Sequence, residues 1–141
     1  CIKEKELPIK LLVGARLDLV GGNSLICLPT DRAAYGRLSV LLSLGRRRAP
    51  KGQCELHLSD LAASAEGQIA IALTNDGTSD EFLAHVAAIY PGSAYLAAQC
   101  LYRGDDERRL AALAARAERL NMPLAATNDV ELCHWSELAR L

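Results

Sequence analysis

The sequence predicts an α/β domain with a mostly parallel sheet, and three of its features lead to this prediction. Short apolar runs typical of strands alternate with longer amphipathic runs typical of helices after residue 30. Two apolar runs before that point are joined by a glycine-rich turn, which is typical of a hairpin. The 141 residues include 50% hydrophobic and 23% charged residues, so we expect residues 1–141 to form a single domain with a modest core.

The predicted hairpin opens the domain. Residues 9–19 begin apolar and then alternate between apolar and polar, which indicates a strand. Residues 21–23, with the sequence GGN, predict a turn, and residues 24–30 predict the second strand. The turn is short enough for the two strands to pair with each other.

A helix is predicted next, followed by a basic turn. Asp31 is placed to cap the helix by accepting a backbone N–H, and Gly45 is placed to end it. The predicted apolar face of this helix contains Tyr35, Leu38, Leu41 and Leu42. Residues 45–53 form the predicted turn, which is the only dense basic run in the chain.

The rest of the chain alternates between helices and strands. We predict a helix at 58–67 capped by Ser59, a strand at 69–74, a helix at 80–90, a strand at 94–102, a helix at 105–120, a strand at 124–129 and a helix from 134. Such alternation favours parallel strands, whose carboxyl ends carry the functional residues of α/β proteins. The ends concerned are Thr74-Asn75-Asp76, Gln99-Cys100-Leu101 and Asn128-Asp129.

Charge and cysteine content narrow the classes of function. The net charge of −1 gives no overall basic field for nucleic acid, so any contact with DNA must be local. The five cysteines are scattered without a Cys-x-x-Cys pair, which indicates reduced thiols and a cytoplasmic location. Neither a membrane-spanning run nor a signal peptide is visible. The chain begins at Cys1 within a charged stretch, so we expect a fragment of a longer protein.

Three stretches of the chain together resemble one family. They are LPIKLLVGARL, LPTDRAAYGRLSVLLSLGRRRAPKG and LNMPLAATNDVE. They resemble the PHP (polymerase and histidinol phosphatase) domain of the bacterial DNA polymerase III alpha subunit family. The TDRAAYGRL and RRRAPKG segments are most similar to its error-prone, translesion branch. The resemblance implies a partial, distorted (β/α)7 barrel that lacks its N-terminal strands and first metal motifs.

This sequence departs from the family at the metal-binding positions that the resemblance covers. The family has Gly-x-Glu where this chain has Gly14-Ala15-Arg16, and an arginine there repels a cation. The family has Asn-Asp-Val-His where this chain keeps Asp129 but carries Glu131 in place of histidine. A family histidine is also missing from the run 99–102. We therefore expect no metal site, with Asp129 and Glu131 as its remaining positions, and no cofactor in the fragment.

The resemblance also implies a function for the parent protein, namely template-directed DNA synthesis with Mg²⁺ held in a separate palm domain. Its expected partners are the other domains of the polymerase, DNA, deoxynucleotides and the sliding clamp. The fragment itself is expected to be a scaffold without catalytic residues. Two alternatives remain open: a stand-alone metal-dependent phosphoesterase of the same superfamily, and a non-enzymatic module that binds DNA or a protein partner.

Four basic residues are the candidate binding site: Arg46, Arg47, Arg48 and Lys51. They could contact a phosphate backbone or a neighbouring polymerase domain, and the alternative is a solvated surface loop. For Asp129 and Glu131, the alternatives to a metal site are a turn cap and a solvated side chain. Cys133 and His134 are adjacent in sequence, so their side chains diverge and do not predict a nucleophile pair.

Overall fold

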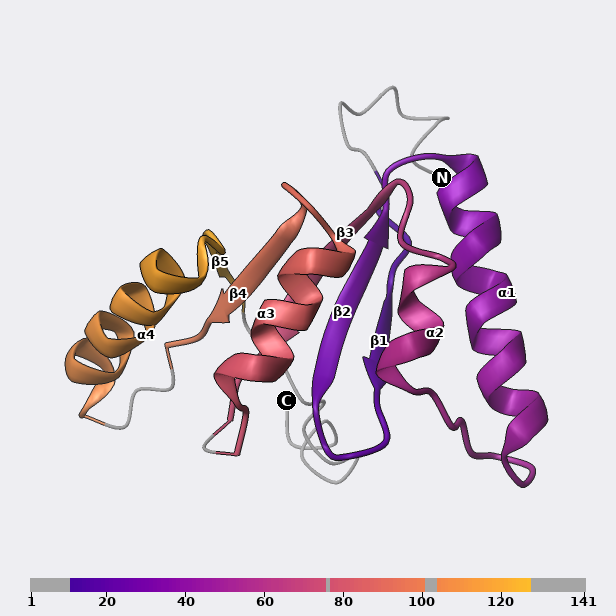
Figure 1. The fold of residues 1–141 in the computed structure, drawn as a ribbon, viewed down its shortest axis with the longest axis horizontal. Helices are drawn as coiled ribbons and strands as arrows, with labels where there is room; N and C mark the ends of the chain where they lie inside the picture. The colour runs from indigo at the N-terminus through magenta and orange to yellow at the C-terminus, as the bar shows by residue number, and fades with distance from the viewer. Residues whose placement is uncertain (1–10, 76, 101–103, 128–141) are drawn as a thin grey trace, which may run out of the picture.

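The computed structural model describes residues 11–75, 77–100 and 104–127, and in these residues it shows a five-stranded mixed sheet with four helices (Figure 1). The strands lie in the sheet in chain order. The elements are β1 (Ala15–Asp18), β2 (Ser24–Pro29), α1 (Arg32–Arg48), α2 (Leu58–Ala62), β3 (Gln68–Leu73), α3 (Asp80–Ile89), β4 (Ala94–Ala98), α4 (Asp106–Leu120) and β5 (Leu124–Ala126). The α/β class predicted from the alternating pattern is confirmed.

The sheet is half antiparallel and half parallel. β1 and β2 form the predicted hairpin, and β2 also pairs with β3 in the antiparallel sense. The β3–β4 and β4–β5 pairings are parallel, each joined by one helix. The described strands are mostly parallel, as predicted, but not all of them, because β2 runs against the other four. The antiparallel pairing of β2 with β3 was not predicted. It arises because the chain between these strands returns to the end of the sheet where β2 stops, and there the backbone N–H of Thr30 donates to the backbone oxygen of Gly67 over 2.9 Å.

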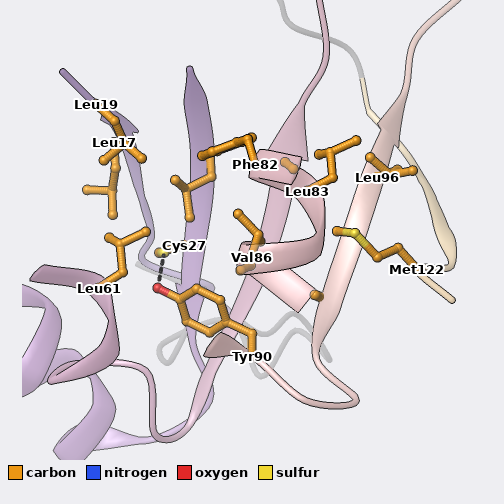
Figure 2. Packing of buried hydrophobic residues seen from close by; sticks show 14 of the residues in the cluster. Leu17, Leu19, Cys27, Leu61, Phe82, Leu83, Val86, Tyr90, Leu96 and Met122 are labelled. Carbon is orange, nitrogen blue, oxygen red and sulfur yellow. Dashed lines mark hydrogen bonds between the residues drawn. The ribbon is translucent and has the colours of Figure 1, made fainter. Parts of the chain in front are cut away.

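The hydrophobic core lies between the helices and one face of the sheet. Alternate strand residues point to this face because side-chain direction has a period of two. Leu17, Leu25, Ala72 and Leu96 follow one another across the sheet by register, and all are buried. Figure 2 shows Leu17 and Leu96 of this row in the same cluster as Phe82, Leu83 and Val86 of α3. One continuous core therefore joins all four helices to the sheet.

The opposite face of the sheet is also apolar, but no described helix covers it. Ile26 lies beside Ile71, which lies beside Tyr95, and Leu28 lies beside Ile69. All five side chains are half-buried, and the neighbouring residues in each strand belong to the core face. The described strands form an open sheet, with β1 and β5 at its edges.

Helix α1 is longer than predicted. It runs through Gly45 to Arg48, so three of the four basic residues lie in its last turn and only Lys51 lies in the following turn. Gly45 lets α1 pack closely against the segment that contains Cys54, since a Cβ at this position would lie 2.6 Å from the Sγ of Cys54. The helix ends where Ala49 becomes extended before Pro50, as residues that precede proline do.

Two further predictions about helices are wrong in detail. Tyr35 is 49% exposed, and Ala34 takes its place in the core, where its carbonyl accepts the side chain of Gln68 over 2.7 Å. Helix α2 is capped by His57 instead of Ser59 and ends at Ala62, five residues earlier than predicted. The predicted Asp31 cap of α1 is confirmed, with Oδ1 accepting the N–H of Ala34 over 2.7 Å.

Candidate functional site

The carboxyl ends of four strands share one edge of the sheet. β1, β3, β4 and β5 run in the same direction, and β2 begins where β1 ends. The register places Asp18 opposite Ser24 and Ser24 opposite Leu73, with Ala98 opposite Ala126 further along. The predicted strand-end residues that the structure describes therefore follow this edge, as expected for parallel strands.

Asn75 closes a turn at this edge. Its Oδ1 accepts the backbone N–H of Gly77 over 2.9 Å and the hydroxyl of Thr78 over 3.0 Å. The Thr78 hydroxyl in turn accepts the N–H of Asn75 over 3.1 Å. The polar groups of Asn75 are used to shape the loop before α3.

Arg16 and Asp18 form an ion pair at the end of β1. The Nε of Arg16 lies 2.9 Å from Oδ1 of Asp18, and the hydroxyl of Ser24 donates to the same oxygen over 2.6 Å. The Ser24 hydroxyl, followed by Arg16, lowers the pKa of Asp18 below its usual value. Asp18 was not recognised from the sequence. Its carboxylate forms an ion pair with Arg16.

The remaining strand-end positions include one cysteine and the two acidic residues of the sequence motif. Cys100 is exposed, and its Sγ lies 3.5 Å from Oδ2 of Asp106. Asp129 and Glu131 lie outside the described residues. Within the described ranges, no group of three or more His, Cys, Asp or Glu side chains is arranged to hold a metal ion.

The basic segment, which we define as Arg46, Arg47, Arg48 and Lys51, divides into two parts. Arg46 and Lys51 line one shallow hollow of about 480 Å³. Arg46, Arg47 and Lys51 are exposed, and none of them forms an ion pair with a described residue. The positive ends of these three side chains are therefore available to a negatively charged partner.

Arg48 is engaged within the chain. Its Nη1 lies 2.6 Å from Oδ2 of Asp60, and the same oxygen accepts the backbone N–H of His57 over 2.9 Å. The bond to Arg48 is the main cause that lowers the pKa of Asp60, and the same bond raises the pKa of Arg48. Much of the charge of Arg48 is thus used to join α1 to α2.

Sequence reasoning missed two arginines that the fold brings to the strand-end edge. Arg109 and Arg116 of α4 line a hollow with Thr74 and Asn75 at the end of β3. Their spacing of seven residues places them on one side of the helix. That spacing, on a helix between two strands, is the sequence feature that could have identified them.

No helix in the described part of the chain is both long enough and apolar enough to span a membrane. No protein-family model matches the chain. Curated relatives do match it. The chain is 39% identical over 137 residues to the error-prone DNA polymerase of Caulobacter vibrioides. This match covers 94% of this chain and 13% of the relative.

Two further relatives give the same result. The chain is 40% identical over 124 residues to error-prone DNA polymerase 1 of Agrobacterium fabrum, and 44% identical over 124 residues to the error-prone DNA polymerase of Ruegeria pomeroyi. These matches cover 86% and 85% of the chain, and 11% of each relative. The chain therefore spans about one-eighth of the length of such proteins, and the similarity supports a fragment of the error-prone DNA polymerase family.

Proposed function

We propose that the chain is the PHP-domain segment of an error-prone DNA polymerase. The observation that carries this proposal is the 39% identity over 94% of the chain to a polymerase of that name. The whole protein would catalyse template-directed DNA synthesis in the cytoplasm, with DNA and deoxynucleotides as its substrates. The Mg²⁺ ions for that chemistry would be held by carboxylates of a separate palm domain, where they would stabilise the charge of the transferred phosphoryl group.

The two faces of the sheet support a barrel in the parent protein. Helices cover one face, and the half-buried apolar residues Ile26, Leu28, Ile69, Ile71 and Tyr95 line the other. In a (β/α)7 barrel, helices lie outside and the inner sheet face is filled with side chains. We infer that further strands join the β1 and β5 edges and enclose this second face.

The segment would serve as a scaffold and would not be a phosphoesterase. Arg16 stands where the resembling family has a metal-binding glutamate, and its guanidinium lies 2.9 Å from Asp18. A fixed positive charge at a ligand position repels a divalent cation, and a cluster of metal ions needs several ligands that converge. Asp129 and Glu131 would then be remnants of a lost site.

The basic segment would contact the DNA backbone or an adjoining part of the replication machinery, including the sliding clamp. Arg46, Arg47 and Lys51 carry exposed charges at one end of α1, and Arg46 and Lys51 line the same hollow. Lysine and arginine bind phosphates by charge, which strengthens binding without reading sequence. Arg48 would contribute less, because Asp60 already holds it at 2.6 Å.

The test is DNA binding by the full-length polymerase, measured by fluorescence anisotropy over a range of salt concentrations. Arg46→Glu with Arg47→Glu and Lys51→Glu should weaken binding and reduce the salt slope by about 0.7 to 0.9 for each DNA phosphate that the protein no longer neutralises. The control is Arg32→Glu, which reverses one charge on the exposed first residue of the same helix and is compared per reversed charge. An unchanged slope in the triple variant would show that the basic segment is solvated surface.

Primer extension and hydrolysis assays test the rest of the proposal. Full-length protein should extend a primer with Mg²⁺, and the 141-residue chain should not hydrolyse a phosphoester when Mn²⁺ or Zn²⁺ is added. If the chain hydrolyses the phosphoester faster as metal is added, the scaffold proposal is wrong and a stand-alone phosphoesterase is favoured. A full-length protein without primer extension would remove the polymerase assignment.

A further inference from the structure

A second basic site lies at the carboxyl edge of the sheet, on the far side of β3 from the hairpin. A hollow of about 210 Å³ is lined there by Thr74, Asn75, Arg109, Ala112, Leu113 and Arg116. Two guanidinium groups and a threonine side chain therefore meet an apolar wall formed by α4. Apolar neighbours limit the water around a bound charge and so strengthen its interaction with the arginines.

Arg116 is held rigidly in this hollow. Its Nε donates to Oδ1 of Asp80 over 2.5 Å, and its Nη2 donates to the backbone oxygen of Thr78 over 2.5 Å. Its side chain is only 21% exposed. No described residue accepts a hydrogen bond from its Nη1, so one end of a positioned guanidinium remains available.

Arg109 is positioned in a similar way. Its Nη2 donates to the backbone oxygen of Gln99 and, over 2.9 Å, to Oδ1 of Asp106. Its Nε is buried and has no partner among the described residues. A buried donor without an acceptor is unfavourable, and an incoming oxyanion could remove that cost.

The charges around the hollow leave a positive excess. Among the described residues, ion pairs join Arg109, Arg116 and Arg119 to two carboxylates, Asp106 and Asp80, and Asp80 is shared by Arg116 and Arg119. The carboxylates fix the guanidiniums from outside the hollow, since neither of them lines it. This arrangement orients two arginines toward a ligand before it binds, and arginine matches the planar oxygens of a phosphate.

We propose that this hollow, the α4 arginine pocket, binds a phosphate group. The ligand is a phosphate monoester or diester, supplied by a nucleotide or by a DNA backbone. The two guanidiniums bind the phosphate oxygens, and the hydroxyl of Thr74 adds a hydrogen bond. The proposal is independent of the polymerase assignment, because it rests on contacts within the described residues. It concerns different residues from the basic segment at the end of α1.

The first experiment maps binding on the unmodified chain. Backbone and arginine Nε–H resonances are followed by NMR as inorganic phosphate replaces chloride at constant ionic strength. We expect saturable shifts at Asn75, Gly77 and the Nε–H groups of Arg109 and Arg116. Shifts that do not saturate, or that gather at the basic segment instead, would overturn the pocket.

Paired variants then separate the pocket from general charge. Arg109→Gln and Arg116→Gln should each weaken phosphate binding roughly tenfold, since each removes a charge-assisted contact. Arg108→Gln removes the same charge from the exposed neighbour of Arg109 and does not alter the lining of the hollow. This control should bind phosphate as the unmodified chain does. Equal weakening in the control and the pocket variants would show only a diffuse charge effect and reject the site.

Two ligands identify the source of the phosphate. Deoxyadenosine monophosphate carries a terminal monoester, and a short single-stranded oligonucleotide without terminal phosphates carries only diesters. Saturable shifts at the pocket with the first alone assign a nucleotide, and shifts with the second alone assign a DNA backbone. Absence of pocket shifts with both, and with inorganic phosphate, would refute the proposal even if the polymerase assignment holds.

Discussion

The guanidinium of Arg48 lies 2.6 Å from the carboxylate of Asp60, and this contact ties the last turn of α1 to the first turn of α2. Asp60 also accepts the backbone N–H of His57 over 2.9 Å, so one carboxylate serves both helix ends. The side chain of Asp60 is only 10% exposed, so its half of this ion pair is largely shielded from water. The basic residues at the end of α1 thus divide by role: Arg48 joins two helices, whereas Arg46 and Arg47 are exposed and available to bind a partner.

The first prediction concerns this carboxylate. Asp60→Ala removes a helix cap and leaves Arg48 without its partner, so it should lower the free energy of unfolding by about 1 kcal/mol. Urea denaturation followed by circular dichroism measures the change. The control is Glu66→Ala, which removes an 86% exposed carboxylate lying 3.5 Å from Arg37. That control should change stability by less than about 0.5 kcal/mol, and an equally small effect at Asp60 would contradict the linking role.

The second prediction concerns pH. Hydrogen bonds from Ser24 to Asp18, from Arg48 to Asp60 and from Arg119 to Asp80 lower the pKa of all three carboxyls in the folded chain. A carboxyl with a lowered folded pKa binds its proton more readily when unfolded. Its contribution is therefore complete above the unfolded pKa of about 3.9 and is lost as pH falls through the folded pKa.

Stability should accordingly stay level from pH 7 to about 5 and decline below about 4. Denaturation at a series of pH values measures this dependence, and Asp60→Asn should make the decline shallower because one of the three groups no longer titrates. NMR titration of the aspartate carboxyl carbons checks the pKa values directly. A rise in stability on acidification, or a carboxyl pKa of Asp60 above its usual value, would disprove this account.

The third prediction uses two glycines of α1. A Cβ at Gly45 would lie 2.6 Å from Sγ of Cys54 and 2.8 Å from Cδ2 of Leu56, whereas a Cβ at Gly36 would meet nothing within 4 Å. Gly45→Ala should therefore lower the free energy of unfolding by about 1 to 3 kcal/mol through overpacking. Gly36→Ala should raise it by about 0.5 to 1 kcal/mol, because alanine favours a helix interior over glycine.

Thermal and urea denaturation of the two variants provide the comparison, since each makes the same chemical change in the same helix. Opposite signs are expected. If both variants gained stability, Gly45 would be a tolerated helix interruption, and the contact between α1 and the segment containing Cys54 and Leu56 would be looser than the structure indicates.

Gly45 also shows where the sequence could predict the fold and where it could not. The alternating apolar runs identified all five described strands, since a buried face leaves a period of two or a continuous apolar run. The helix end was missed because glycine has two uses, ending a helix and permitting close packing. Only the position of Cys54 against Gly45 distinguishes them, and that contact is not local in sequence.

The antiparallel pairing of β2 with β3 and the arginine pocket could not be predicted from the sequence for a similar reason. Residues 31–67 contain two helices, and their sequence does not reveal that together they return the chain to the end of β2 beside Gly67. The basic segment was visible as a dense run of charge. Arg109 and Arg116 were not, since only the packing of α4 against the end of β3 brings them beside Thr74.

The fourth prediction concerns the reactivity of the thiols. Cys27 is 1% exposed beneath α3, its Sγ lies 3.8 Å from the hydroxyl of Tyr90, and burial raises its pKa to about 11. Only about one thiol in a thousand is then ionised at pH 8, whereas Cys54 is exposed. Iodoacetamide should therefore alkylate Cys27 at least about a hundredfold more slowly than Cys54 in the folded chain, measured on the separate peptides by mass spectrometry. The difference should vanish in denaturant, where both thiols meet the same solvent. Comparable rates in the folded chain would mean that β2 opens often enough to expose its core face.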